Sequence, residues 1–262
     1  MKKFLGLLIL TAGLTAGAQE FKGVAVYESV STHKNAAARV SDKFDPAIHE
    51  RMKEALSKPV ERQYTLYFDK TISVFEEEQK LSMDSPNRRV SPGIVSGKTY
   101  RDLKNNFEIE EREIFGKEFL VTDTLKRREW KLENETKKIG SHTCYKATYT
   151  IKRSLSKIEG GQDKAIDLTG SPEEIIVTAW YAPEIPVNHG PGGYWGLPGL
   201  ILSVSNDNMT LLCSTLTLNP KAGVEIKVPN RGEKVTKEEF RVIMAKKLEE
   251  MKGMRGTDIR RH

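Results

Sequence analysis

Over much of the chain, apolar residues alternate with polar ones, and this period of two is typical of strands with one buried face. Turn-forming residues such as Asp69-Lys70 and Asn206-Asp207-Asn208 separate these segments. We therefore predict an α+β fold, an antiparallel β-rich domain with about ten short strands arranged as a curved sheet or half-barrel, with a few peripheral helices. The predicted strands are residues 21–30, 60–68, 72–77, 100–102, 107–114, 118–122, 130–132, 143–152, 175–181, 200–204, 209–218 and 224–228.

Two segments have the period of an amphipathic helix instead. In residues 45–57, Asp45 is placed to cap the first turn and Pro46 suits the first helical position. Near the C-terminus, Thr236 and Glu239 form a capping-box pattern, and Gly253 is placed to end the helix. The apolar positions that share a face are Ile48, Met52 and Leu56 in the first helix and Phe240, Ile243, Met244, Leu248 and Met251 in the second.

Two long polar segments, residues 79–98 and 154–173, contain glycine and are predicted to be surface loops. Charged runs such as residues 108–113 are interpreted as solvated faces. No internal repeat or linker divides the chain. We therefore expect one β-rich domain over residues 19–254, followed by a basic, flexible tail over residues 255–262.

The N-terminal residues have the order expected of a secretory signal peptide. Lys2 and Lys3 precede an apolar run over residues 4–14, and Ala16 and Ala18 follow in an A-x-A arrangement. The apolar run is too short for a spanning helix, which needs roughly 20 residues. Residues 1–18 are thus predicted to be removed, and no cysteine follows them to accept a lipid. We expect an exported protein that does not span the membrane after cleavage.

The composition supports a soluble globular protein and disfavours one class of partner. Hydrophobic residues make up 38% of the chain and charged residues 30%, with a net charge of +6 that falls to +4 without Lys2 and Lys3. Acidic residues are interspersed with the basic ones, and no Lys/Arg stripe with interleaved aromatic residues is present. Nucleic acid is therefore not an expected partner.

Two cysteines, Cys144 and Cys213, lie in strand-like segments. In an oxidising compartment an even pair can form a disulfide. The alternative is two buried free thiols. The spacing of the two residues along the chain does not decide between these alternatives.

The segment 180–201 is the least ordinary part of the chain, because it combines four prolines with five glycines between two strongly apolar strands. These residues favour a bent but rigid loop. We consider its aromatic and ionisable residues as candidate binding residues for an apolar or peptide-like ligand. The alternative is that the aromatic rings pack over the edge of the sheet, with His189 and Glu184 as ordinary loop residues. The candidates are Trp180, Tyr181, Glu184, His189, Tyr194 and Trp195.

The same segment carries a family resemblance. Residues 196–201 read GLPGLI, and upstream lie AWY at 179–181, PEIPV at 183–187 and GP at 190–191. Together with a W-x-L strand at 130–132 and an IGSHTCYKA strand at 139–147, they cover roughly residues 118–205. The chain thus resembles the GLPGLI family of exported Bacteroidetes proteins, which is uncharacterised biochemically. The resemblance implies the periplasm or cell envelope of a Gram-negative bacterium, and a strand arrangement similar to that of periplasmic lipoprotein carriers.

Catalytic motifs are absent from the sequence. The five histidines have no metal-ligand spacing, and H-E-x-x-H, C-x-x-C and G-x-S-x-G do not occur. We therefore predict no catalytic residue, metal or cofactor. The leading hypothesis is an envelope protein that binds a ligand or docks a partner, such as an outer-membrane protein, through residues 180–201. A hydrolase acting on glycan or peptide, which could use Glu184 with His189, and a purely structural envelope component remain alternatives.

Overall fold

The structure is a computed structural model that describes residues 21–32, 45–78, 94–114, 116–153 and 173–258. The predicted signal peptide and most of the two predicted polar loops lie outside these residues. The described elements are β1 (Gly23–Ser31), α2 (Pro46–Ser57), β2 (Val60–Phe68), β3 (Ile72–Glu77), β4 (Ile94–Asp102), β5 (Phe107–Ile114), β6 (Lys117–Thr124), β7 (Lys131–Ile139), β8 (His142–Arg153), β9 (Glu173–Ala182), β10 (Leu200–Asn206), β11 (Met209–Leu218), β12 (Glu233–Thr236) and α3 (Lys237–Asp258).

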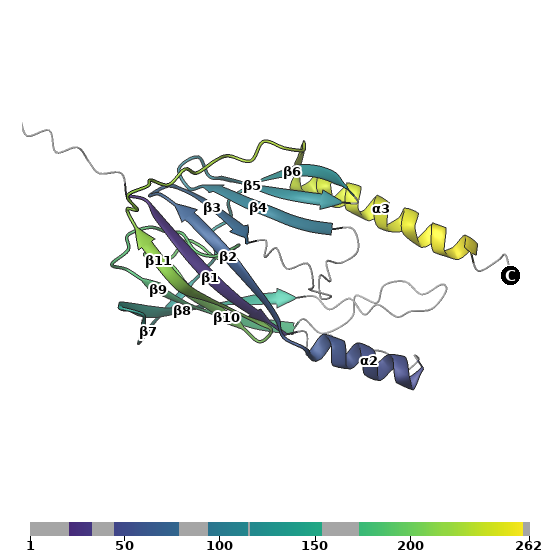
Figure 1. Cartoon of the computed structure of the whole chain (residues 1–262), viewed down its shortest axis with the longest axis horizontal. Coiled ribbons are helices and arrows are strands. Elements are labelled where there is room, and N and C mark those ends of the chain that lie inside the picture. Colours follow the sequence, from purple (N-terminus) through teal and green to yellow (C-terminus); the bar gives the residue numbers. More distant parts are fainter. Residues whose placement is uncertain (1–20, 33–44, 79–93, 115, 154–172, 259–262) are drawn as a thin grey trace, which may run out of the picture.

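The twelve described strands form one open sheet in the order β12-β6-β5-β4-β3-β2-β1-β11-β10-β9-β8-β7. All neighbours are antiparallel except β12 and β6, which pair in parallel. The sheet is strongly twisted, so that β4, β5 and β6 run across the direction of β1 and β11 (Figure 1). The predicted fold class, a mostly antiparallel β-rich domain with few helices, is confirmed.

The first strand of the chain lies in the middle of this sheet. Every residue of β1 has a partner on β2, from Gly23 opposite Phe68 to Ser31 opposite Val60. On its other side β1 pairs with β11, with a bulge between Val26 and Tyr27. The face of β1 that carries Ala25 and Tyr27 packs into the main core, and both residues are fully buried.

The main hydrophobic core lies over this central part of the sheet. The buried side chains of β1, β2, β10 and β11 pack there against Ile185 and Val187 from the segment between β9 and β10. The hydroxyl of Tyr27 donates a 2.7 Å hydrogen bond to the Ile201 carbonyl, so its one polar group is satisfied inside the core. A second cluster on β8–β10 includes Val177, Ala179 and Leu197.

The C-terminal helix begins where the sequence predicted it. The Glu239 carboxylate accepts a 2.7 Å hydrogen bond from the Thr236 backbone N–H, and the Glu239 backbone N–H donates to the Thr236 hydroxyl at 3.2 Å. This reciprocal pair is a capping box. The first turns of α3 bury Phe240 against Phe119, Val121 and Val235, which fixes α3 on β6 and β12.

The structure differs from the predicted elements in four places, one of which is β7, which continues from the predicted residues 130–132 to Ile139. Residues 224–228 form no strand although Val224, Ile226 and Val228 alternate, and residues 233–236 form β12 instead. The alternation alone does not show which segment reaches a free sheet edge, and β12 is the segment that reaches β6. In addition, β4 begins at Ile94 within the predicted loop, and α3 continues past Gly253 to Asp258.

The predicted helix over residues 45–57 is confirmed. Asp45 caps α2 by accepting a 2.9 Å hydrogen bond from the Ala47 N–H, and Pro46 occupies the first helical position. Neither α2 nor α3 combines the length and the apolar composition that a membrane-crossing helix requires, so no such helix is found in the described ranges.

We expect Gly199→Ala to destabilise the protein far more than Gly196→Ala. Both glycines have positive φ, but a Cβ at Gly199 would lie 2.4 Å from the Ala182 carbonyl oxygen, whereas a Cβ at Gly196 would meet nothing within 4 Å. The strained φ alone should cost about 1–2 kcal/mol at each position, and the clash should raise the loss at Gly199 above about 3 kcal/mol. Urea unfolding of both variants measures the two losses, and equal losses would contradict the close approach.

Candidate functional site

The loop that connects β9 to β10, residues 183–199, folds back onto the sheet and is held by its own hydrogen bonds. Asn188 lies at its centre: the carbonyl accepts from the Gly196 N–H at 2.9 Å, and the side-chain amide donates to the Leu197 carbonyl at 2.8 Å. The Leu200 N–H donates to the Ile185 carbonyl at 3.1 Å. The 183–199 loop therefore has a fixed conformation, as its proline and glycine content predicted.

Three side chains from other parts of the chain donate hydrogen bonds to backbone carbonyls of this loop. Arg101 Nη2 on β4 donates to the Gly192 carbonyl at 2.8 Å. Arg128 Nε donates to the Gly193 carbonyl at 2.9 Å, and Trp130 Nε1 donates to the Trp195 carbonyl at 2.9 Å. The tip of the loop is thereby tied to β4 and to the segment that precedes β7.

Arg101 is the least expected of these three donors, because only 1% of this charged residue is exposed. Its guanidinium lies 5.7 Å from the ring centroid of Trp195, and Nη2 is 3.4 Å from a Glu108 carboxylate oxygen. Burial lowers the pKa of Arg101, while Glu108 opposes that shift. The buried cation is thus compensated by a carbonyl, a carboxylate and a ring face rather than by one close ion pair.

The aromatic candidates point into the protein. Trp195 and Tyr181 are buried, and Tyr194 is half-buried. The Arg128 guanidinium lies over the rings of Tyr194 and Tyr149, at 5.6 and 5.0 Å from their centroids. Trp180 packs against the main core with Lys137 Nζ 4.3 Å from its ring centroid. These positions match the alternative in which the aromatic residues pack over the sheet, and ligand binding by them stays a prediction.

Glu184 and His189 are not brought together. The Glu184 side chain is 51% exposed and pairs with Nδ1 of His142, whereas His189 is fully buried. His142 was not among the sequence candidates, since it is the first residue of β8 and lies 42 residues from its partner. Nothing in the local sequence around His142 signals this contact.

His189 lies in an environment that disfavours its protonation. It is 0% exposed, its ring lies 6.3 Å from that of Phe68, and neither ring nitrogen has a hydrogen bond of ordinary geometry within the described residues. Burial, and to a lesser extent the charge of Arg101, lower the pKa of His189 from 6.5 to about 4, against smaller opposing effects of Asp69. His189 is therefore neutral at physiological pH.

The two cysteines are free thiols in the structure, so the disulfide alternative is not seen. Burial raises the pKa of both Cys144 and Cys213 to about 11. The Cys213 thiol donates to the Thr215 carbonyl at 3.4 Å. Protonated, largely buried thiols of this kind are poor nucleophiles.

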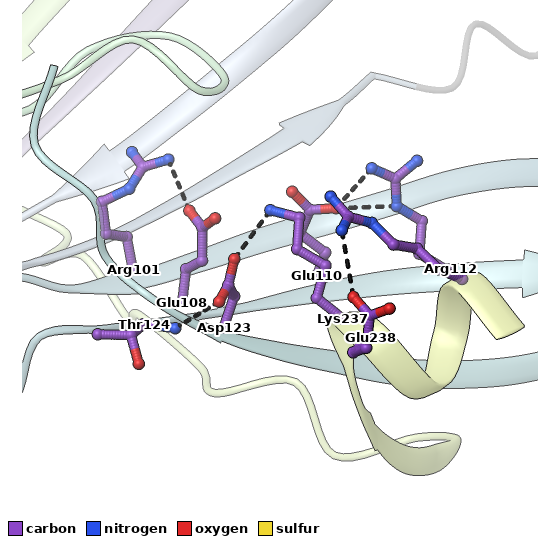
Figure 2. A network of polar contacts seen from close by, with 9 residues as sticks. Arg101, Glu108, Glu110, Arg112, Asp123, Thr124, Lys237 and Glu238 are labelled. Carbon is purple, nitrogen blue, oxygen red and sulfur yellow. Dashed lines mark hydrogen bonds and ion pairs between the residues drawn. The ribbon is translucent and has the colours of Figure 1, made fainter.

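Two grooves lie away from the aromatic candidates. One, of ≈ 180 Å³, lies between the turn that joins β7 to β8 and strands β10 and β11, and includes His142 and Cys213. The other, of ≈ 170 Å³, lies between α3 and strands β5 and β6 (Figure 2), and we call it the α3 groove. It is lined by Glu108, Glu110, Arg112, Val121, Asp123, Lys237, Phe240, Arg241 and Met244.

Ion pairs organise the walls of the α3 groove. Arg112 Nε lies 2.9 Å from a Glu110 oxygen on the same strand, and Lys237 Nζ lies 2.9 Å from Asp123 Oδ2 across the groove mouth. The hydrogen bond from Lys237 and its positive charge lower the pKa of Asp123. Within the described ranges, no group of three or more His, Cys, Asp or Glu side chains has the arrangement needed to hold a metal ion.

We expect the stability of the protein to fall as the pH is lowered from 6.5 towards about 4, in the window set by the two pKa values of His189. Between these two pH values His189 binds a proton in the unfolded chain but not in the folded chain. His189 should therefore lower the free energy of unfolding by roughly 3 kcal/mol once the pH has fallen through this window. Urea unfolding of the wild type and of His189→Leu across this window measures the effect. The slope of stability against pH should be shallower in the variant, and identical slopes would contradict the assignment.

Comparison with known proteins supports the resemblance at a coarse level. The sequence of residues 130–203 matches a family described as a protein of unknown function (Porph_ging), an uncharacterised family tied to Porphyromonas gingivalis and the Bacteroidetes. None of the curated proteins matches the chain. Two crystal structures of PNGF-II, in space groups P21 and C2, are similar with TM-scores of 0.49 and identities of 11% and 12%. The match covers 85% and 86% of this chain but 32% and 33% of PNGF-II, so the chain spans about a third of that protein's length.

Proposed function

We propose that this chain is an exported protein of the cell envelope that docks a partner protein on the outer edge of the 183–199 loop. The observation that carries the proposal is the division of this loop into two sides. Its apolar residues Ile185, Val187 and Leu197 are buried, and its tip is tied down by Arg101 and Arg128. The opposite side faces solvent and has a fixed shape.

The outer edge of the loop consists of small rigid residues and two polar ones. Its exposed side chains are those of Pro183, Glu184, Pro186, Asn188 and Pro198, and Gly193 and Gly196 are the other exposed residues of the loop. The close approach of Gly199 to the Pro183 Cα brings the two ends of the loop together, so Pro183 and Pro198 belong to one surface. A surface that is already ordered loses little conformational entropy on binding, which favours recognition of a protein surface.

A small apolar ligand is less well supported than a protein partner. The rings that were candidates to receive it, those of Tyr194 and Trp195, are occupied by contacts with Arg128 and Arg101. The loop itself fills the space above the strands β9 and β10, where Leu197 packs against Ile201 and Val204. A ligand there would have to displace part of the core.

The hydrolase alternative gains no support from the described residues. Glu184 and His189, which it required in one cleft, lie apart as described above. Carboxylates do gather in the α3 groove, but a glycan hydrolase needs one that keeps its proton near neutral pH. Lys237 lowers the pKa of Asp123 and so acts in the opposite direction.

Site-specific photocrosslinking in the native host tests the docking proposal. A photoreactive residue at Pro186 or Pro198 should give an adduct of one discrete mass, because both positions lie on the outer edge of the loop. The same residue at Lys221 or Lys227, which are also exposed but lie beyond β11, serves as the matched control. Adducts of equal yield at all four positions, or none at the loop, would refute the proposal.

Export is tested separately by the N-terminus of the protein from its host. The mature chain should begin at Gln19 and fractionate with the periplasm or envelope, because Ala16 and Ala18 fit the peptidase that cleaves after small residues. Ala18→Arg should block cleavage and leave the heavier precursor, whereas Gln19→Asn should be processed normally. A wild-type chain that retains residues 1–18 in the cytoplasm would rule export out.

A further inference from the structure

The α3 groove combines an apolar floor with charged walls. Val121 on β6 and Phe240 and Met244 on α3 form the floor, and the ring of Phe240 is held edge-on against Phe119 at a centroid distance of 5.6 Å. The walls come from alternate residues of β5, from Asp123 on β6, and from the first turns of α3 (Figure 2). The groove is therefore built on a sheet and a capped helix, which hold its side chains in place.

The charges in the walls balance. Three carboxylates, those of Glu108, Glu110 and Asp123, face three cations, those of Arg112, Lys237 and Arg241. The formal sum over these six side chains is zero. An anion would meet the three carboxylates and a cation would meet the three basic groups, so the groove disfavours a ligand with a net charge of either sign.

The walls nevertheless offer many hydrogen-bonding atoms in fixed positions. Asp123 Oδ1 accepts a hydrogen bond from the Thr124 N–H, and Asp123 Oδ2 accepts one from Lys237 Nζ. Arg112 Nε donates to the Glu110 carboxylate and so fixes its orientation. A carboxylate has about four acceptor positions and a guanidinium five donors, so these pairs can accept from and donate to a ligand at the same time. All four side chains are partly exposed to solvent.

We infer that the α3 groove binds a neutral saccharide ring. Such a ring carries hydroxyls that both donate and accept, which suits the paired carboxylates and cations, and it has an apolar C–H face that suits the floor of Val121 and Met244. The volume of ≈ 170 Å³ lies below the roughly 300–1,000 Å³ of pockets that enclose drug-sized ligands, so the site accommodates one ring. This inference does not rest on the docking proposal, because the two surfaces share no residue.

Saturation-transfer NMR on the mature chain, residues 19–262, tests the inference. The probes are four neutral sugars, glucose, galactose, mannose and N-acetylglucosamine, together with glucuronate as an anion and glucosamine as a cation. At least one neutral sugar should bind saturably, and the charged sugars should bind at least about tenfold more weakly. Loss of a hydrogen bond to a charged group should make Glu110→Gln and Asp123→Asn about tenfold weaker for that sugar.

The control is Glu225→Gln, which makes the same chemical change at an exposed Glu225–Lys227 pair outside the groove. It should bind the sugar as the wild type does. Urea unfolding of each variant confirms that the protein is folded, and Glu110→Asp provides a second groove variant that keeps the charge but shortens the side chain. Absence of binding by all four neutral sugars, equal binding by a charged sugar, or full binding by both Glu110→Gln and Asp123→Asn would overturn the inference.

Discussion

The fold depends on how the backbone carbonyls of the 183–199 loop are satisfied. A loop that buries its apolar side also takes carbonyl groups out of water, and each needs a donor. Gly192 and Trp195 cannot find these donors in a strand, so Arg101 and Trp130 supply them from other parts of the chain. Arg128 adds a solvent-exposed hydrogen bond to the Gly193 carbonyl. The loop, β4 and the segment before β7 are therefore one unit. Within this unit the charge of the buried Arg101 lowers the pKa of His189, and the outer edge of the loop has a fixed shape.

Most strands and both helices could be predicted from the sequence, because their signals are local. The alternation in residues 72–77 and 209–218 gave the bounds of β3 and β11, and the Thr236–Glu239 pattern gave the start of α3. The pairing of β12 with β6 could not be predicted from the sequence, because it depends on which strand, distant in the sequence, has a free edge in the sheet. The loop was singled out correctly as rigid, but the direction in which its side chains point depends on Arg101 and Trp130, which lie at least 65 residues away.

The α3 groove shows that the positions of polar residues are equally hard to predict when they depend on distant parts of the chain. Residues 108–113 were interpreted as a solvated face, and Glu108 and Glu110 do keep contact with solvent. However, pairing in the sheet sets Glu108 opposite Asp123, and the folding of α3 over this face adds Lys237 and Arg241. A charged run therefore becomes one wall of a groove only when β6 and a helix more than a hundred residues further along are in place. No spacing within the run carries that information.

The central position of β1 also has a consequence for the order in which the chain can fold. Its partner β11 ends at Leu218, so the middle of the sheet cannot be completed until nearly all of the chain is available. Pairings of such high sequence separation form slowly. One edge of β1 can pair early with β2, which begins at Val60, but its other edge stays open until β11 is present. If the chain is exported as we propose, the middle of its sheet would be completed only after most of the chain has crossed the membrane.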